Sequence, residues 1–260
     1  MILRRVIAHV GKQEWTAIAI DLAVVIVGVF IGIQVSNWNA EREANLRGAV
    51  FTERLKADLR DEAWYYQLQI EYNRQVLANA ERAVTALGSQ PADSNEALLI
   101  SAYRATQYKQ RSRSRSTYDE LVSTGTIGLI RSRTLRNTAM QVFNFPTLDN
   151  ISREGMQSRY REAFRMSVSN DVQRALLNHC GDRFVEVGDY KGLVALLDYP
   201  CRTDLPAASI DEAAMALRTN GNLVPLLRLR IADIESRLND LTGNNRDIRV
   251  DLQAIAKDGS

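Results

Sequence analysis

An uninterrupted run of uncharged, mostly apolar residues from Leu22 to Val35 constrains the fold of this chain more than any other feature. Extended back to Ile18, the run would measure about 27 Å as a helix, close to the ~30 Å hydrocarbon core of a bilayer. Trp15 and Trp38 flank it where the aromatic residues of a membrane interface usually lie. The sequence therefore predicts a transmembrane helix over residues 16–38, with the lipid bilayer as its first partner.

Two other structures are compatible with this segment. A secretory signal peptide also has a basic start, here Arg4, Arg5 and Lys12, but residues 34–39 lack the small residues of a cleavage site. A buried helix of a soluble protein is the second alternative, although charge-free helices of this length are rare in soluble domains. The one charge in the extended segment, Asp21, lies near an end and can reach the headgroups. We expect an uncleaved anchor.

Charges and cysteines bear on the orientation of this anchor. Residues 1–15 carry more basic than acidic side chains, which favours a short cytoplasmic tail, but acids and bases alternate beyond the span and weaken the bias. Cys180 and Cys201 bracket a segment with loop-like ends. A disulfide there would stabilise the fold by about 3 kcal/mol and would persist only in an oxidising compartment. Two cysteines also occur by chance in reduced proteins, so the bridge is a prediction that favours an exterior domain.

The remainder of the chain predicts an all-α domain. About 220 residues follow the anchor, and 45% of the whole chain is hydrophobic, which is enough to form a core. From Leu59 to Leu87, apolar residues recur at steps of four and three, and no proline or glycine occurs between Val50 and Leu87. We therefore expect the anchor to continue as a stalk helix over residues 39–88. The net charge of +2 gives no reason to expect a nucleic acid partner.

Local signals divide the rest into shorter helices. Three helix starts of the capping type are predicted at Asp93–Glu96, Thr117–Glu120 and Ser209–Glu212. We also expect one longer helix over residues 151–177 and a short helix over residues 191–197 inside the cysteine loop. Together these elements predict a helical domain over residues 89–221.

The C-terminal segment, residues 222–260, has the clearest periodicity. Its apolar positions follow a heptad pattern at Leu227, Ile231, Ile234, Leu238, Leu241, Ile248, Leu252 and Ile255. Asn245 occupies an a position, where a polar residue can set the register of a coiled coil. Gly243 lies within the pattern and favours a break. Two alternatives remain open: an intermolecular coiled coil, and a broken helix packed on its own domain.

The sequence contains no recognisable catalytic, cofactor or metal motif. His179 lies beside Cys180 but without the spacing of a metal site, and there is no nucleophile elbow, phosphate-binding loop or dinucleotide fingerprint. We therefore predict no catalytic residue, no cofactor and no metal. Gly28 and Gly32 form a GxxxG pattern within the span, which allows close packing of membrane helices, although this pattern is also common by chance.

Two groups of arginines are candidates for anion contacts. The first comprises Arg111, Arg113 and Arg115, which alternate with serines and are more typical of a solvated connector. The second comprises Arg131, Arg133 and Arg136, which would receive a small anion if the exterior domain senses a ligand.

Two short segments resemble a known family. Asn37-Trp38-Asn39 closes the span, and Tyr118–Gly125 reads Y-D-E-L-V-S-T-G. Together they resemble uncharacterised bacterial membrane proteins in which an "I-N-N-W-N" span end is followed, about eighty residues later, by a "T-x-x-E-L-x-S-x-G" helix end. This chain departs from the pattern at Val35-Ser36 and at Tyr118. The resemblance covers roughly residues 15–145 and implies a bacterial cytoplasmic membrane. With the orientation favoured by the N-terminal charges and the cysteines, we expect the N-terminus inside and the bulk of the chain in the periplasm. It implies no activity and no catalytic residue.

Three functions follow as expectations. The first is a non-enzymatic accessory or scaffolding subunit of a membrane assembly, bound to another membrane protein or to a second copy, because a GxxxG span is combined with heptad-patterned helices. The second is an exterior ligand-sensing domain that acts through a partner, since the cytoplasmic tail is too short to signal alone. The third is an enzyme that uses carboxylates or arginines which the sequence does not group.

Overall fold

The computed structural model describes residues 15–88 and 94–257, and every regular element in these ranges is helical. The elements are α2 (Trp15–Leu87), α3 (Asn95–Ala105), α4 (Ser116–Ser123), η1 (Ile127–Leu129), α5 (Arg133–Phe143), α6 (Thr147–Met156), α7 (Arg159–Ser167), α8 (Asn170–Cys180), η2 (Gly192–Ala195), α9 (Ala207–Thr219), α10 (Leu223–Asn239), η3 (Asp240–Asn244) and α11 (Arg246–Lys257). The predicted all-α fold, with a long N-terminal helix followed by a helical domain, is confirmed.

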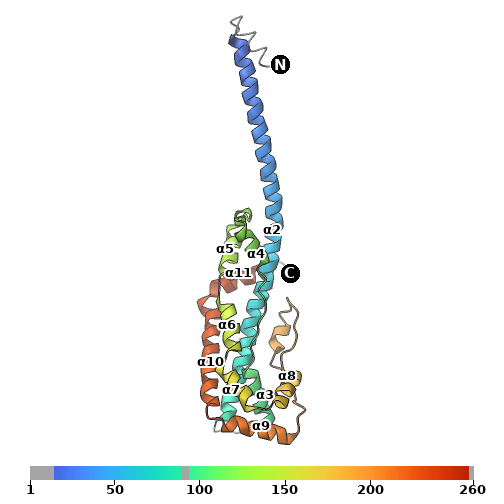
Figure 1. The fold of residues 1–260 in the computed structure, drawn as a ribbon, viewed down its shortest axis with the longest axis vertical. Coiled ribbons are helices and arrows are strands. Elements are labelled where there is room, and N and C mark those ends of the chain that lie inside the picture. Colours follow the sequence, from blue (N-terminus) through green and yellow to red (C-terminus); the bar gives the residue numbers. More distant parts are fainter. Residues whose placement is uncertain (1–14, 89–93, 258–260) are drawn as a thin grey trace.

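Helix α2 is a single continuous helix of 73 residues, and its two halves lie in different surroundings. Its N-terminal half projects from the domain as a bare rod, and its C-terminal half runs through the middle of the bundle (Figure 1). Burial begins at Gly48 and becomes regular from Leu55 onward. Only the first part of the predicted stalk over residues 39–88 therefore projects from the domain. From Leu55 to Ala83 it is the central helix of the domain, because its apolar stripe packs against the later helices of the same chain.

Two adjoining hydrophobic cores surround this central helix. The core nearer the projecting rod joins α2 to α4, α5, α6 and α11, with Tyr66 and Leu121 among its buried side chains. The second core lies toward the end of α2 and joins Ala80 and Ala83 to Tyr160 and Phe164 of α7. Small residues on α2 in this second core allow helix α3 to approach closely.

Buried polar side chains of α2 hold two segments that contain no α-helix. Gln75 donates to the carbonyl of Leu193 (2.7 Å) and accepts from the backbone N–H groups of Leu197 (2.7 Å) and Asp198 (3.0 Å). Gln69 donates in the same way to the carbonyl of Lys109 (3.0 Å). These bonds satisfy backbone groups that neither segment can pair internally, so α2 serves as a polar scaffold as well as an apolar one.

The connector that contains Arg111, Arg113 and Arg115 is part of this scaffold, so the prediction of a solvated segment is wrong for its central residue. The Arg113 guanidinium is 7% exposed and bonds the buried carboxylate of Glu62 at 2.6 Å. The other Glu62 oxygen accepts the backbone N–H of Ser114 at 2.9 Å. A charge buried at this depth needs a hydrogen-bonded partner, and Glu62 supplies it from α2.

The helix starts differ from the three capping predictions. Helix α3 is capped by Ser94, whose side chain accepts from the N–H of Ala97, whereas Asp93 lies outside the described residues. The N–H of Thr117 donates to Asp58 on α2, so a distant carboxylate replaces the predicted local capping box. Ser209 lies inside α9, which begins at Ala207 directly after a proline. In the last two cases the caps are not made by side chains at the predicted positions.

The single helix expected over residues 151–177 is also wrong, because three helices, α6, α7 and α8, occupy this region. Ser158 and Ser169 adopt extended backbone conformations at the two breaks, and the Ser169 side chain accepts from the N–H of Val172. The short helix expected inside the cysteine loop is the 3-10 turn η2.

The C-terminal segment packs on its own domain. Ile234, Leu241 and Leu252 are buried in the core nearer the rod. The helix is interrupted by the π-helical turn η3, and the Asn245 amide donates to the carbonyl of Asp240 at 2.9 Å, within this interruption. The same carbonyl accepts the backbone N–H of Asn245 at 3.2 Å, so Asn245 closes the π-helical turn with two bonds. Of the two alternatives left open, the structure has the broken helix folded onto its own chain.

Candidate functional site

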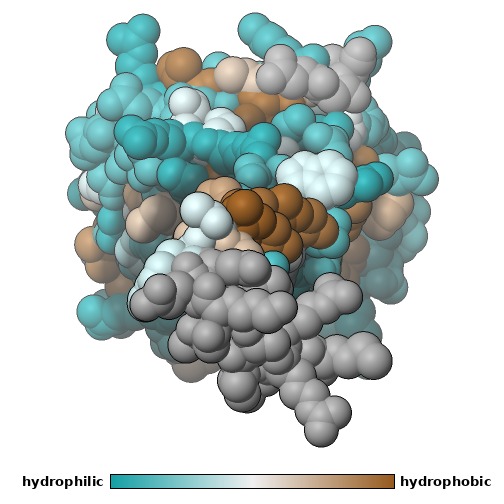
Figure 2. Space-filling model, turned by 90° about the horizontal axis from the view of Figure 1, so that it is seen from above, coloured by the Kyte–Doolittle hydropathy of each residue, from teal (hydrophilic) through white to brown (hydrophobic). Residues whose placement is uncertain are grey.

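The projecting half of α2 carries many large apolar side chains that the helical domain leaves exposed. An 18-residue window of this helix has a mean hydropathy of 2.6, and none of it is buried, so by length and composition it is a candidate membrane span. Side chains as large as Phe30 are 60% exposed. Viewed along α2 from its N-terminal end, apolar side chains stand beside a mostly hydrophilic domain surface (Figure 2). Burying an exposed apolar surface of this extent is strongly favourable, so water is an unsuitable environment for it.

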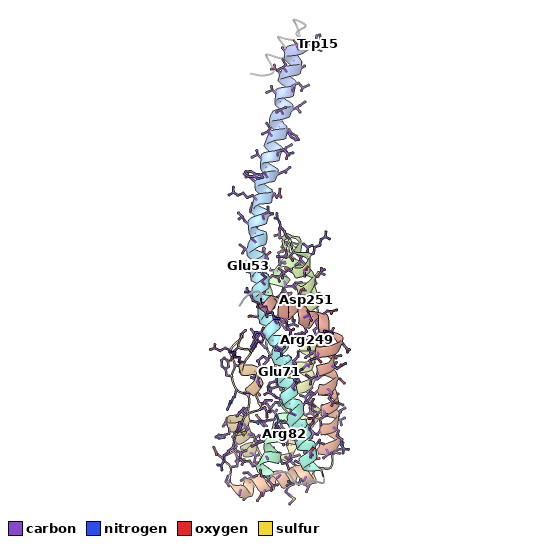
Figure 3. The ribbon with its side chains drawn as sticks, turned by 180° about the vertical axis from the view of Figure 1, so that it is seen from behind. Trp15, Glu53, Glu71, Arg82, Arg249 and Asp251 are labelled. Atoms are coloured by element: carbon purple, nitrogen blue, oxygen red, sulfur yellow. A yellow bond between two sulfur atoms is a disulfide. The ribbon has the colours of Figure 1, made fainter. Side chains whose placement is uncertain are left out.

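The two tryptophans lie at the positions expected for interface residues. Trp15 is at the far end of α2 (Figure 3) and is 71% exposed, and Trp38 is 61% exposed. The two tryptophans are 23 positions apart, which corresponds to about 35 Å of helix, close to the thickness of a bilayer's apolar core with its borders. Both rings are therefore free to lie at the two borders of an apolar layer.

One face of the rod combines the two predicted packing glycines with exposed apolar residues beyond Trp38. At 100° per residue, Gly28, Gly32, Leu46 and Val50 lie within about 40° of one another around the helix. A methyl group placed on either glycine would meet no atom within 4 Å. Leu46 and Val50 are 62% and 61% exposed. We call this surface, defined by these four residues, the open face of α2.

The domain contacts the rod on the opposite side. Gly48 is buried and lies about 160° around the helix from the open face. A Cβ atom at this position would lie 2.6 Å from the carbonyl oxygen of Leu129, so the 3-10 turn η1 packs directly on the helix backbone there. The tip of the domain, formed by η1 and the ends of α4 and α5, therefore leaves the open face uncovered.

The three arginines proposed for an anion lie at this tip but are used in other ways. Arg131 donates to the side chain of Asn45 on α2, and Arg136 donates to the carbonyl of Ile130. Arg133 is exposed at the first position of α5. Two of the three thus hold the tip to the rod and to its own turn, so the geometry does not favour an anion site here.

The predicted disulfide joins Cys180 to Cys201, and a buried arginine lies beneath it. Arg104 is 4% exposed and donates to the carbonyls of Cys180 (3.2 Å) and Tyr199 (3.0 Å). Its guanidinium lies 4.6 Å from the centre of the Tyr199 ring, and burial lowers its pKa. A disulfide is typical of an oxidising compartment.

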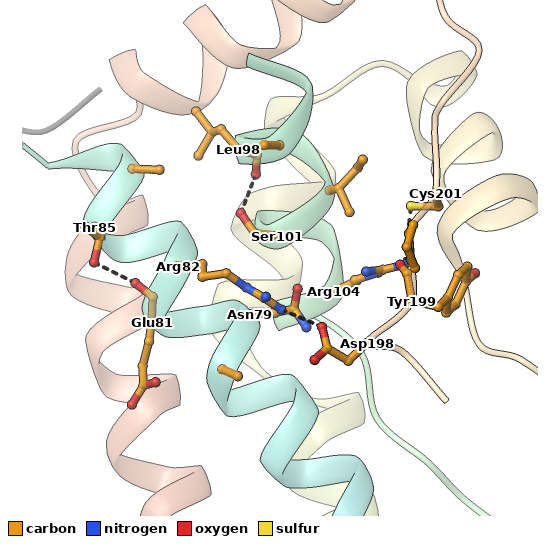
Figure 4. Close-up of a pocket in the computed structure, with 15 residues that line it drawn as sticks. Asn79, Glu81, Arg82, Thr85, Leu98, Ser101, Arg104, Asp198, Tyr199 and Cys201 are labelled. Carbon is orange, nitrogen blue, oxygen red and sulfur yellow. Dashed lines mark hydrogen bonds and ion pairs between the residues drawn. The ribbon is translucent and has the colours of Figure 1, made fainter. Parts of the chain in front are cut away.

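A cavity of about 950 Å³ opens beside this arginine, between α2, α3 and the segment that ends at Cys201 (Figure 4). Arg82 reaches across it and forms an ion pair with Asp198 at 3.1 Å. Arg104 is bonded to carbonyls and Arg82 to a carboxylate. The polar groups of this cavity therefore mainly connect residues 180–201, the disulfide segment, to the bundle. The sequence gives no signal for it, since its walls come from residues more than a hundred positions apart.

Within the ranges 15–88 and 94–257, no group of three or more His, Cys, Asp or Glu side chains is arranged to hold a metal ion. His179 has Asp204 as its neighbour, with 3.6 Å between Nδ1 and Oδ2, and both side chains are largely exposed.

No protein-family model, curated protein or solved structure matches this chain. The resemblance of residues 15–145 to bacterial membrane proteins therefore stays a prediction.

Proposed function

We propose that this chain is a non-enzymatic, single-pass protein of a bacterial cytoplasmic membrane and acts as an accessory or scaffolding subunit of a membrane assembly. Residues 16–38 cross the bilayer, residues 1–15 lie in the cytoplasm, and the helical domain lies in the periplasm. The disulfide between Cys180 and Cys201 supports this orientation, because such a bond is stable in the periplasm and is reduced in the cytoplasm.

The observation that carries the proposal is the open face of α2. Gly28 and Gly32 allow a second helix to approach the backbone within the bilayer, where packing of small residues drives association. Leu46 and Val50 extend the same face beyond Trp38, where exposed apolar side chains gain free energy by leaving water. A partner that follows this face would be a membrane protein whose own helix continues past the bilayer surface. The domain tip lies on the other side and does not obstruct it.

The proposal is tested by purifying the tagged full-length protein from its native membrane in mild detergent and identifying co-purified proteins by mass spectrometry. We expect a membrane protein in stoichiometric amount. A variant with Gly28→Leu and Gly32→Leu should lose this partner, because the larger side chains block close helix packing.

Ala23→Leu is the matched control, since it also enlarges a small residue of the apolar segment but lies on the opposite side of the helix. Retention of the partner by the glycine variant would contradict the role of the open face. Recovery of the chain without any other protein would contradict the accessory-subunit function.

A further inference from the structure

A second cavity, of about 340 Å³, lies between the end of α3, helix α7 and the start of α8. Three arginines line it, Arg161 and Arg165 from α7 and Arg174 from α8, and the remaining polar lining includes Gln173. None of the described residues that line this cavity is acidic. We call it the arginine cavity.

The positive charge of the arginine cavity is only partly balanced. Arg174 pairs with Asp171 one turn earlier in α8. In the described part of the chain, Arg161 and Arg165 form no ion pair. Arg161 instead donates to the carbonyl of Thr106 at 3.1 Å and stacks 5.0 Å from the ring centre of Tyr108. The carbonyl and the ring orient the Arg161 guanidinium but do not neutralise its charge. Arg161 and Arg165, which are one helical turn apart, therefore present two positive charges to the same cavity.

The burial and the proximity of these arginines affect the pKa values of the side chains that line the cavity. Burial, and next the neighbouring Arg165, lower the pKa of Arg161. Arg161 and Arg165 also lower the pKa of the Tyr103 hydroxyl, which lines the same cavity. Burial and Asp182 outweigh them and raise this pKa to about 12. The guanidinium groups are therefore close enough to influence one another and the cavity wall. An anion in the cavity would relieve this repulsion.

We propose that the arginine cavity binds a small, multiply charged oxyanion of the phosphate or phosphate monoester type. Guanidinium groups present planar pairs of N–H donors that match phosphate oxygens, and two or three of them suit more than one negative charge. The first turn of α8 also borders the cavity, but its Asp171 carries a negative charge that offsets the partial positive charge of the helix end. The volume accommodates a small molecule and not a polymer.

The place of the cavity in the fold identifies the source of the ligand as the surrounding solution. Helix α7 packs in the same core as Ala80 and Ala83 of α2. These positions lie about 70 Å along the helix from Val35, the end of the apolar run. Helices α7 and α8 are also at the end of the domain that is remote from the projecting rod (Figure 1). Lipid headgroups beside the rod would therefore not reach the cavity.

The sequence contains part of the signal for this site. Arg161 and Arg165 are four residues apart and so share a helix face. Arg174 joins them only because the chain breaks between α7 and α8, which periodicity does not predict.

The test uses the full chain in nanodiscs of zwitterionic lipid, with isothermal titration calorimetry against inorganic phosphate at constant ionic strength. We expect saturable binding to the unmodified protein. Arg165→Gln should weaken it about tenfold or more, because one charge-assisted contact is lost. Arg165 is exposed, so this variant should fold normally, which circular dichroism would verify. Arg159→Gln is the matched control, since Arg159 is an exposed arginine of the same helix outside the cavity lining. It should leave the affinity within about twofold.

Two results would overturn the proposal. The first is the absence of saturable binding up to about 10 mM phosphate. The second is an equal loss of affinity in the Arg165 and Arg159 variants, which would indicate only a general effect of net charge. Replacing the nanodisc lipid by an anionic one should not compete with phosphate, and competition would assign the site to lipid headgroups instead.

Discussion

Replacing Gln75 by methionine tests whether buried polar groups of α2 hold the disulfide segment. The substitution keeps the length and most of the volume of the side chain but removes one donor and one acceptor. It strands the carbonyl of Leu193 and the N–H groups of Leu197 and Asp198, which Gln75 bonds at 2.7, 2.7 and 3.0 Å. The Leu193 and Leu197 groups are buried, and each buried backbone group left without a partner costs roughly 1–3 kcal/mol, whereas Asp198 is an exposed residue whose N–H adds less. We therefore expect Gln75→Met to lower the free energy of unfolding by about 3–5 kcal/mol.

Urea unfolding of the full chain in detergent, followed by circular dichroism, measures this change. Hydrogen exchange adds a local reading, because the amides of Leu197 and Asp198 should lose protection before the rest of the bundle. Gln67→Met is the matched control on the same helix. Gln67 is half-buried and, within the described part of the chain, its side chain bonds Glu71 one turn away, so its loss should cost no more than about 0.5 kcal/mol.

A loss below about 1 kcal/mol for Gln75→Met, or equal losses for the two variants, would refute the reasoning. Either result would mean that the disulfide segment is held by its apolar contacts and its covalent bond, and that the Gln75 hydrogen bonds are easily replaced by water.

Three further predictions concern stability. Cys201→Ser removes the disulfide, whose loop spans 21 residues, and should lower the free energy of unfolding by about 3 kcal/mol; dithiothreitol should have the same effect on the unmodified protein and none on the variant. Gly48→Ala should destabilise the domain by about 1–3 kcal/mol because η1 packs on that backbone position, whereas Gly128→Ala, with no atom within 4 Å, should show no such loss in the same urea experiment. Two bonds from Thr203 (2.7 and 2.6 Å) lower the pKa of Glu96 below its ordinary value of 4.5, so this carboxylate stabilises the fold above its unfolded pKa and the contribution disappears as the pH falls through the folded pKa. Glu96→Gln should therefore reduce the fall in Tm between about pH 5 and pH 3, and an unchanged Tm profile would contradict this assignment.

The parts of the fold that depend on local pattern could be predicted from the sequence. The apolar run and the stripe from Leu59 to Leu87 are periodic over many turns, and they correspond to α2. The same pattern does not distinguish a stalk that stands alone from a helix whose stripe is covered by its own chain. The sequence therefore predicts a stalk where the structure has the buried half of α2.

The parts that depend on distant residues could not be predicted. Asp58 bonds the N–H of Thr117, and Glu62 bonds that of Ser114, so helix α4 and its approach are held by a helix fifty or more positions earlier. A capping pattern reports only neighbouring side chains. The arginine cavity is another example, since its walls come together only after the chain turns between α7 and α8. Tertiary contacts, which a single sequence does not display, decide such features.

The continuity of α2 has a mechanical consequence. A helix with no proline and no break from Trp15 to Leu87 has no hinge, so the segment proposed for the bilayer and the centre of the helical bundle must move as one lever. About 73 Å of helix lies between Trp38 and Leu87. A change of about 10° in the tilt of the part proposed for the bilayer would therefore displace the far end of the bundle by about 13 Å. A membrane partner that tilts this helix would reposition the remote end of the domain, including the arginine cavity, without any change in the fold.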